Sequence, residues 1–430
     1  MPIPGPPRPT RRAWLAALVL VLIATSTGIL LGRAPATPDA EPVAAALGRA
    51  PAPRPAHDPT AAVLRAQAAA LIRGDERGWL AAVDPDKPRL RERYSRIYTA
   101  LRGLGISQFV YHGRASVAPT GGTLAVRTHV TYCFSRRSCP AYDDVQWKGP
   151  PRIVQTLSFK KVRGRYVITA LGKAPTPNGL QPTPWENGEL FFARGNRVTV
   201  AAPGTQRKNL RRVLELAEKA AAVTDRYAAL VRNPQSRYRI YLADDQAWTS
   251  WYGGKKEKWV VGLAVPLNDA GTDIVLRMSR LGDARMLGPT IQHEMGHVVT
   301  LSGATAREPA EDRWLSEGIA EYIGWAPEPA SASRRALSVQ VAFRGGKRPT
   351  TLIGKPPGGK AGDVAVDAFY GLGHFATDCM VRRYGERKLF AFVRLTLRQD
   401  MPYDQAARQA FGKPFASVDK ACIAWIAKQL

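Results

Sequence analysis

The stretch that decides the fold starts with His293-Glu294-Met295-Gly296-His297 and continues downstream with Trp314-Leu315-Ser316-Glu317-Gly318-Ile319-Ala320-Glu321-Tyr322. Residues four apart share one face of a helix, so His293 and His297 can direct two imidazoles at a single metal ion. Glu294 lies about 100° further round the helix, where it can act on a water as a general base without binding the metal. Glu317 is the expected third ligand, and three protein ligands leave a fourth position open, as in catalytic zinc sites. The stretch therefore predicts a catalytic Zn²⁺ centre.

Both segments have the features of helices. Pro289 suits a first helical position and Ser302-Gly303 a helix end, while the acids between 308 and 312 suit the start of the second helix. Within that second helix, Glu321 follows Glu317 by four residues and lies on the same face. We therefore expect Glu321 to accept a hydrogen bond from the outer N–H of a ligating histidine, which would fix the histidine's tautomer.

These motifs resemble those of the gluzincin metallopeptidases, in which a HExxH helix is joined by a glutamate ligand from a downstream helix. The pattern Trp-Leu-x-Glu-Gly-x-Ala-Glu-Tyr is also similar to that of the bacterial peptidase MA-like group. The resemblance covers roughly residues 190–430 and implies a thermolysin-like zincin domain with a mostly helical C-terminal part. The implied metal ligands are His293, His297 and Glu317, with Glu294 as the catalytic base.

The same resemblance suggests where an oxyanion would be stabilised. Thermolysin-like enzymes use additional Tyr and His residues for this purpose, and this chain offers Tyr370 and His374 in Phe369-Tyr370-Gly371-Leu372-Gly373-His374. We therefore expect Tyr370 and His374 to be catalytic. The strand at 273–278, directly before the metal helix, is expected to be the sheet edge along which a peptide substrate aligns.

Two other functions are compatible with these residues. One is a catalytically silent, membrane-anchored adaptor with a vestigial metal site. The other is zinc-dependent hydrolysis of a bond that is not a peptide bond. Chelator-sensitive cleavage of peptides separates the adaptor from a metallopeptidase, which is the function that the motifs favour.

The composition is that of a folded protein with an unusual charge. The chain has 430 residues, of which 45% are hydrophobic, and its 62 Lys and Arg against 35 Asp and Glu give a net charge of +27. Such a balance favours anionic partners, and we expect envelope polymers or lipid headgroups besides a peptide or protein substrate. No zinc-finger spacing or aromatic-glycine RNA-binding signature occurs, so we do not expect nucleic acid as a partner.

The N-terminal segment predicts a membrane anchor. Residues 13–32 are uncharged and rich in Leu, Val and Ile, and Arg8, Arg11 and Arg12 precede them. About twenty apolar residues can span a bilayer, and the basic flank is expected to stay cytoplasmic. We therefore expect a single-pass protein of the cell membrane with its C-terminal domains outside the cytoplasm. Ala34-Pro35-Ala36 leaves open cleavage of a signal peptide and secretion.

The four cysteines agree with an oxidising compartment. Two disulfides are expected, and Cys133–Cys139 with Cys379–Cys422 is the most economical of the three possible pairings. Four buried thiols and zinc binding by these cysteines are the alternatives, the latter weakened by the lack of a CxxC pair.

Changes of pattern along the chain predict its domains. Helical spacing in residues 60–101 is followed by four segments of period two, at 109–117, 123–132, 152–161 and 165–171, which predict helices packed on a curved antiparallel sheet. Leu71-Ile72-Arg73-Gly74-Asp75 followed by Trp79-Leu80 resembles the nuclear-transport-factor-like fold. The expected fold class is therefore α+β, with an N-terminal transmembrane helix, this small domain and then the zincin domain. The expected boundaries are 1–33 for the cytoplasmic tail and anchor, 34–59 for an Ala/Pro-rich linker, 60–174 for the nuclear-transport-factor-like domain, 175–187 for a Pro-rich linker, and 188–430 for the metallopeptidase domain.

Overall fold

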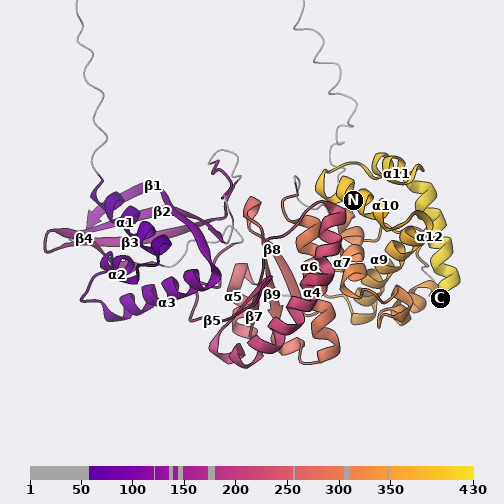
Figure 1. Cartoon of the computed structure of the whole chain (residues 1–430), viewed down its shortest axis with the longest axis horizontal. Helices are drawn as coiled ribbons and strands as arrows, with labels where there is room; N and C mark the ends of the chain where they lie inside the picture. The colour runs from indigo at the N-terminus through magenta and orange to yellow at the C-terminus, as the bar shows by residue number, and fades with distance from the viewer. Residues whose placement is uncertain are drawn as a thin grey trace, which may run out of the picture. The chain divides into compact units, whose positions relative to one another are not determined.

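The computed structural model describes residues 58–120, 122–134, 139–143, 149–172, 180–254, 257–304, 310–345 and 348–430 (Figure 1). These residues form a mixed α/β structure with two sheets. None of the helices in these ranges is long and apolar enough to cross a membrane. This finding contradicts the predicted fold class and localisation, since both included a membrane-spanning helix, and we correct them accordingly. The predicted span at 13–32 lies outside the described residues.

Three helices precede the first sheet. They are α1 (Pro59–Arg73), α2 (Glu76–Ala81) and α3 (Pro88–Leu104). The side chain of Asp58 accepts the N–H of Thr60 at the start of α1, and Gly74 ends the helix with φ of 79°, a conformation that suits glycine. The antiparallel sheet that follows has the order β1-β2-β3-β4, with β1 (Ile106–Thr120), β2 (Thr123–Phe134), β3 (Arg152–Val162) and β4 (Arg165–Leu171). The four expected strands are therefore confirmed.

The second sheet has five strands in the order β5-β6-β7-β9-β8. Their bounds are β5 (Phe191–Arg194), β6 (Val198–Ala202), β7 (Tyr238–Ala243), β8 (Gly262–Pro266) and β9 (Thr272–Arg277). Strands β6, β7 and β9 are parallel, whereas β8 runs antiparallel to β9. The strand expected at the edge, β9, is therefore an inner strand, and β8 forms the edge instead.

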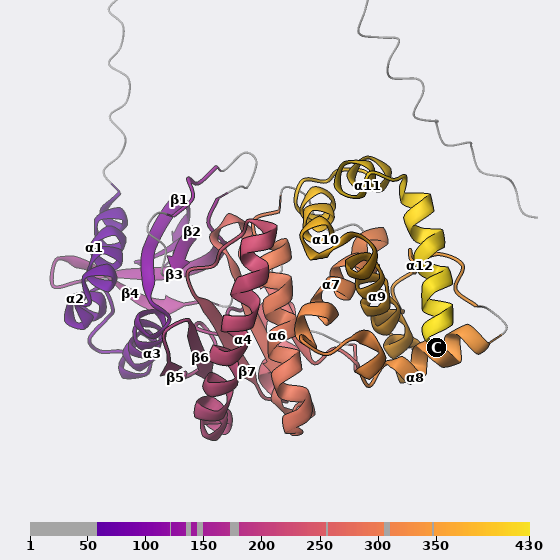
Figure 2. The same cartoon turned by 45° about the vertical axis from the view of Figure 1, so that its right-hand side comes forward.

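Helices build the remainder of this part. They are α4 (Leu210–Val231), α5 (Asp245–Ser250), α6 (Ala284–Leu301), α7 (Arg313–Gly324), α8 (Ala336–Arg344), α9 (Asp363–Tyr384), α10 (Glu386–Val393), α11 (Tyr403–Phe411) and α12 (Phe415–Gln429). Helix α6 begins earlier than Pro289 predicted, because the side chain of Asp283 accepts the N–H of Arg285 and caps it. Helices α4 and α6 lie side by side (Figure 2), and α6 packs on α7, which packs on α9.

The second sheet is buried on both faces, as alternate residues along its strands show. On β7, Ile240 and Leu242 belong to the apolar core with α4 and α6, whereas Tyr241 belongs to the core shared with α1, α3 and β2. Trp185, in the segment predicted as a Pro-rich linker, is completely buried in that second core, 5.4 Å between ring centroids from Tyr132. Both expected disulfides, Cys133–Cys139 and Cys379–Cys422, are confirmed.

Candidate metal centre

Helix α6 carries the first two candidate ligands. His293 and His297 lie four residues apart, and their Nε2 atoms are 3.1 Å apart. Because this spacing is slightly more than one helical turn, both rings leave the helix on the face that meets α7. The helix backbone alone is therefore enough to bring the two imidazoles together.

Helix α7 supplies the third group. The Oε2 atom of Glu317 lies 3.1 Å from Nε2 of His297 and 3.4 Å from Nε2 of His293. A tetrahedral zinc ion with bonds of about 2.0–2.1 Å separates its ligand atoms by roughly 3.3–3.4 Å. The three side chains retain 11–12% exposure, so the point between the donors is not sealed. Two imidazoles and a carboxylate at these separations fit one face of a tetrahedral zinc site.

Small residues allow the two helices to approach. A Cβ at Gly324 of α7 would lie 2.9 Å from the Cβ of His293, and a Cβ at Gly296 of α6 would lie 3.3 Å from the Cα of Ala320. The contact between α6 and α7 therefore depends on glycine on both sides. It places Glu317 against the histidines although twenty residues separate it from His297.

The imidazoles and the carboxylates of the cluster stabilise one another's charged forms. Burial alone would lower the pKa of His293, but the nearby carboxylates of Glu317 and Glu321 raise it to about 10. Burial would raise the pKa of Glu317, yet His297 and His293 hold it far below its usual range. The carboxylate is therefore ionised throughout the physiological range, as a metal ligand must be.

Glu294, the neighbour of His293 on α6, lies against the edge strand β8. It is 6% exposed, and burial raises the pKa of its carboxyl group. The carboxylate accepts the backbone N–H of Ala264 on β8, and a Cβ at Gly262 would lie only 2.2 Å from Oε1 of Glu294. The absence of a side chain at Gly262 thus provides the space that this carboxylate occupies.

Strand β8 also presents backbone groups on its outer side, beside Glu294. The N–H of Arg277 on β9 donates to the carbonyl of Val261. Since backbone groups alternate in direction along an antiparallel strand, those of Gly262 and Ala264 point away from β9. The bond from Ala264 to Glu294 agrees with that alternation.

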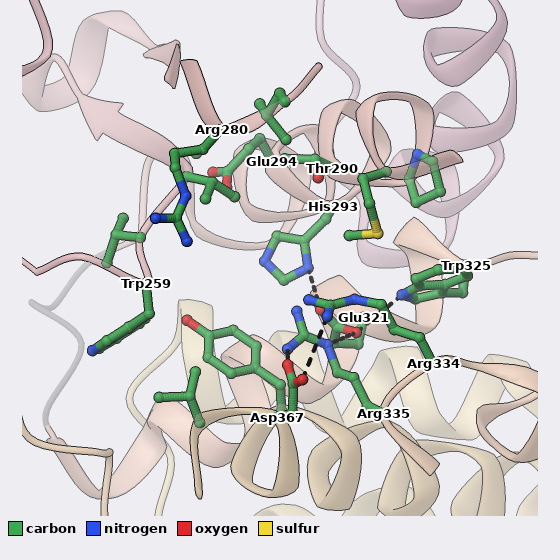
Figure 3. Close-up of a pocket in the computed structure, with 18 of the residues that line it drawn as sticks. Trp259, Arg280, Thr290, His293, Glu294, Glu321, Trp325, Arg334, Arg335 and Asp367 are labelled. Atoms are coloured by element: carbon green, nitrogen blue, oxygen red, sulfur yellow. Dashed lines mark hydrogen bonds and ion pairs between the residues drawn. The ribbon is translucent and has the colours of Figure 1, made fainter. Parts of the chain in front are cut away.

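Glu321 lies next to His293 and is buried, with 2% of its surface exposed. Its Oε1 is 3.1 Å from Nδ1 of His293, and its Oε2 accepts hydrogen bonds from Nε of Arg335 at 2.8 Å and from Nε1 of Trp325 at 3.1 Å. Arg335 also donates to Asp367 through Nη1. A chain of charged groups therefore runs from His293 through Glu321 and Arg335 to Asp367 (Figure 3).

The structure separates the two residues expected to stabilise an oxyanion. Tyr370 lines the cavity, with its ring centroid 6.1 Å from that of His293. His374 is fully buried between helices and does not line the cavity. Its ring lies 6.3 Å from that of Tyr322. Only Tyr370 is thus placed to reach a substrate.

A cavity of about 430 Å³ opens next to His293 and Glu294. Its walls combine aromatic and basic side chains, among them Trp259, Trp325, Arg280, Arg334 and Arg335 (Figure 3). Tyr370 lines the cavity as well. The sequence patterns did not point to Gly262 or Arg335, because each acts through a partner from a different element. Asp367 precedes Tyr370 by three residues on α9, which was the one available signal that it shares the face toward the cavity.

No family model matches the sequence, and no curated protein matches it either. Among solved structures, native yeast LTA4 hydrolase is similar at 12% identity over 70% of this chain and 64% of that chain, with a TM-score of 0.37. A mutant of a two-domain M1 zinc metallopeptidase bound to L-arginine is similar at 14% identity over 62% of this chain and 58% of that chain, with a TM-score of 0.33. A Xanthomonas campestris protein described as a calcium/calmodulin dependent protein kinase II association domain is similar at 13% identity, over 28% of this chain and 86% of that chain, with a TM-score of 0.21.

This chain spans less than two thirds of the length of the LTA4 hydrolase and of the M1 zinc metallopeptidase. The likeness concerns the fold at low identity, and at these TM-scores it carries no argument about activity. What this chain itself presents is a group of two partly buried histidines and a buried glutamate whose ligand atoms lie within 4.8 Å of one another.

Proposed function

We propose that this chain is a zinc-dependent metallopeptidase that hydrolyses peptide bonds. The observation that carries the proposal is the meeting of His293, His297 and Glu317 at separations that suit tetrahedral zinc. The buried Glu294 beside them supplies the base that hydrolysis needs.

A zinc ion held by these three residues would supply Lewis acidity toward a water and a substrate carbonyl. Glu294 takes the proton of the attacking water and returns it to the leaving amine, and the raised pKa of its carboxyl group helps it to hold that proton between the two steps. Burial raises the pKa of Tyr370 well above its usual value, so its hydroxyl keeps its proton and can donate to the developing oxyanion. Glu321 orients His293 through Nδ1.

The edge strand supports a peptide as the substrate. The outward backbone groups of Gly262 and Ala264 can pair with an extended chain, which would then pass Glu294 and the mouth of the cavity. Main-chain pairing of this kind recognises a peptide backbone rather than a particular side chain. The residues that line the cavity all lie at or after Trp259, so we assign the N-terminal half of the described chain no part in the chemistry.

The test is a comparison of Glu294→Gln with the wild-type chain on a peptide library, with and without a chelator. The variant is expected to bind zinc as the wild type does and to lose about 10²–10⁴-fold in turnover, because it lacks the general base. Glu317→Ala is expected to weaken zinc binding. Chelator-insensitive cleavage, or full activity of Glu294→Gln, contradicts the proposal, and zinc binding without any hydrolysis would favour an adaptor.

A further inference from the structure

Arg335 links the carboxylates of Glu321 and Asp367, the charged groups that extend from His293 into the protein. Its side chain is 13% exposed, and it contacts groups from two different helices: Glu321 on α7, and Asp367 and Tyr370 on α9. The guanidinium carbon lies 4.7 Å from the centroid of the Tyr370 ring, a distance typical of a cation–π contact. One side chain thus touches both the support of a candidate ligand and the aromatic wall of the cavity.

The contacts of Glu321 leave it a single orientation. One carboxylate oxygen, Oε2, receives Nε of Arg335 at 2.8 Å and Nε1 of Trp325 at 3.1 Å, which leaves Oε1 facing Nδ1 of His293 at 3.1 Å. Without the guanidinium, Oε2 would keep only the neutral donor of Trp325, and the carboxylate would be free to turn away from His293. Charge-assisted hydrogen bonds are about twice as strong as neutral ones, so Arg335 supplies the stronger of the two restraints.

Arg335 is itself held in place by helix α9. Asp367 accepts from Nη1, while a Cβ at Gly371 would lie 3.1 Å from the Cβ of Arg335, so the glycine lets the two segments touch. A guanidinium presents several donors in a fixed plane and can span two carboxylates while its face lies on a ring. A lysine ammonium at the same position could not keep all three contacts.

We propose that Arg335 is a positioning residue for the metal centre, which fixes Glu321 toward His293 and holds the Tyr370 ring at the cavity. The proposal rests on the proposed function, because it concerns the same zinc site. It predicts that zinc affinity depends on a residue that touches none of the three candidate ligands. Partners of ligating histidines are typically worth about 10–100-fold in metal affinity, and Arg335 acts through such a partner, so about tenfold is expected.

The chain provides a matched control in the neighbouring Arg334. Its Nη1 lies 3.4 Å from Oδ2 of the same Asp367, but its side chain is 46% exposed and has no contact with Glu321 in the described structure. Arg334→Met removes the same charge from the same cavity wall. Zinc affinity should therefore stay at the wild-type value in Arg334→Met and fall about tenfold in Arg335→Met and Arg335→Lys.

The experiment measures zinc affinity of the full chain by competition with a chromophoric chelator, and checks the fold of each metal-free variant by circular dichroism. Glu321→Gln combined with Arg335→Met removes both charges, so it avoids an unpaired buried carboxylate and keeps the test valid if Arg335→Met alone does not fold. The double variant should bind zinc no more weakly than Glu321→Gln alone, because both residues act through one contact.

Wild-type zinc affinity in a folded Arg335→Met chain overturns the inference and leaves the proposed function intact. A double variant that binds zinc more weakly than Glu321→Gln also overturns it, since the two residues would then act separately. If the wild-type chain itself binds no zinc, the proposed function and this inference fail together. The turnover of Arg335→Lys gives a second readout, since displacement of Tyr370 should lower kcat more than it changes KM.

Discussion

At the scale of single residues, Glu294 shows how a missing side chain can place the proposed catalytic base. Its carboxylate occupies the space next to Gly262, and the N–H of Ala264 on the same strand fixes its direction. Strand β8 therefore has two functions at once, since it holds the base and offers the edge on which a peptide can lie.

Gly262→Ala tests this placement. The new Cβ would lie 2.2 Å from Oε1 of Glu294, so the carboxylate must move, and a displacement of about 1 Å can cost about 10²-fold in rate. We expect kcat to fall by that order while zinc affinity stays unchanged. Gly282→Ala is the control, because a Cβ there meets nothing within 4 Å. Equal activity of the two variants would contradict the role of Gly262.

His374 gives a prediction about pH. Burial lowers its pKa below the ordinary 6.5, and in the described structure neither ring nitrogen has a hydrogen-bond partner. Above pH 6.5 the ring is neutral in both states, and its contribution to stability is complete. As the pH falls below 6.5, the unfolded chain takes up the proton first, so the free energy of unfolding decreases, by about 1.4 kcal/mol for each pKa unit of difference.

His374→Leu should remove this component. Chemical unfolding between pH 7 and pH 5 is expected to show a smaller loss of stability for the variant than for the wild type. Peptide hydrolysis should remain close to the wild-type rate, because the ring does not line the cavity. A large loss of turnover with zinc still bound would show that His374 acts in the reaction after all.

Some residues of the candidate site could be predicted from the sequence, and others could not, for physical reasons. Helical spacing pairs His293 with His297 and Glu317 with Glu321, whereas the resemblance to the gluzincins joined the two pairs at one metal ion. The structure brings all four residues together. Arg335 joins α7 to α9 through side chains alone, and no periodicity encodes such a contact.

At the scale of elements, the site depends on how closely helices α7 and α9 approach. Gly318 and Gly373 face each other, and a Cβ on Gly318 would lie 2.6 Å from the carbonyl oxygen of Gly373. The two backbones are therefore in direct contact. This contact sets the position of Glu317, the neighbour of Gly318, relative to the helix that carries Tyr370.

Gly318→Ala should force these helices apart. Overpacking of this kind costs about 1–3 kcal/mol, and zinc affinity should fall as well because Glu317 moves with the helix. Gly358→Ala is the control, since a Cβ there would meet nothing within 4 Å and its backbone has no positive φ. Denaturant unfolding and zinc competition of both variants decide the point, and equal stabilities would refute it.

The order of the strands in the second sheet could not be predicted from the sequence. Strands β8 and β9 are both short and mostly apolar, and the sequence favoured β9 as the edge because it directly precedes the metal helix. Parallel pairing of β9 with β7 on one side and antiparallel pairing with β8 on the other makes β9 an inner strand. Which strand lies outside depends on pairing between distant segments, which a local pattern does not contain.

At the scale of the whole molecule, the segment expected to separate two domains contributes to a shared core. Trp185 is completely buried next to Tyr132, and the residues from His57 onward form one compact unit. The prolines of this segment suggested a linker, but composition does not reveal that one tryptophan within it belongs to a core that also contains residues of the second sheet. We therefore expect the two halves to unfold together.

The disulfide between Cys379 and Cys422 ties α9 to α12 across 43 residues of sequence. Closing a loop of that length in the unfolded chain is worth about 4 kcal/mol. Replacing both cysteines by alanine should lower the free energy of unfolding by that order, as measured by denaturant titration. A far smaller change would mean that packing of α12 alone retains this part of the molecule.

The edge strand has a consequence for inhibitor chemistry. Of the residues whose backbone groups point outward, Ala264 donates its N–H to Glu294, and Pro266 has no N–H. The carbonyl groups on the same side point outward as acceptors. A ligand that lies along this strand must therefore mainly donate hydrogen bonds to it. Under the proposed function, we expect peptidomimetics that keep their own amide hydrogens to suit this protein, and we expect backbone N-methylation, a common route to protease resistance, to remove the groups that hold them.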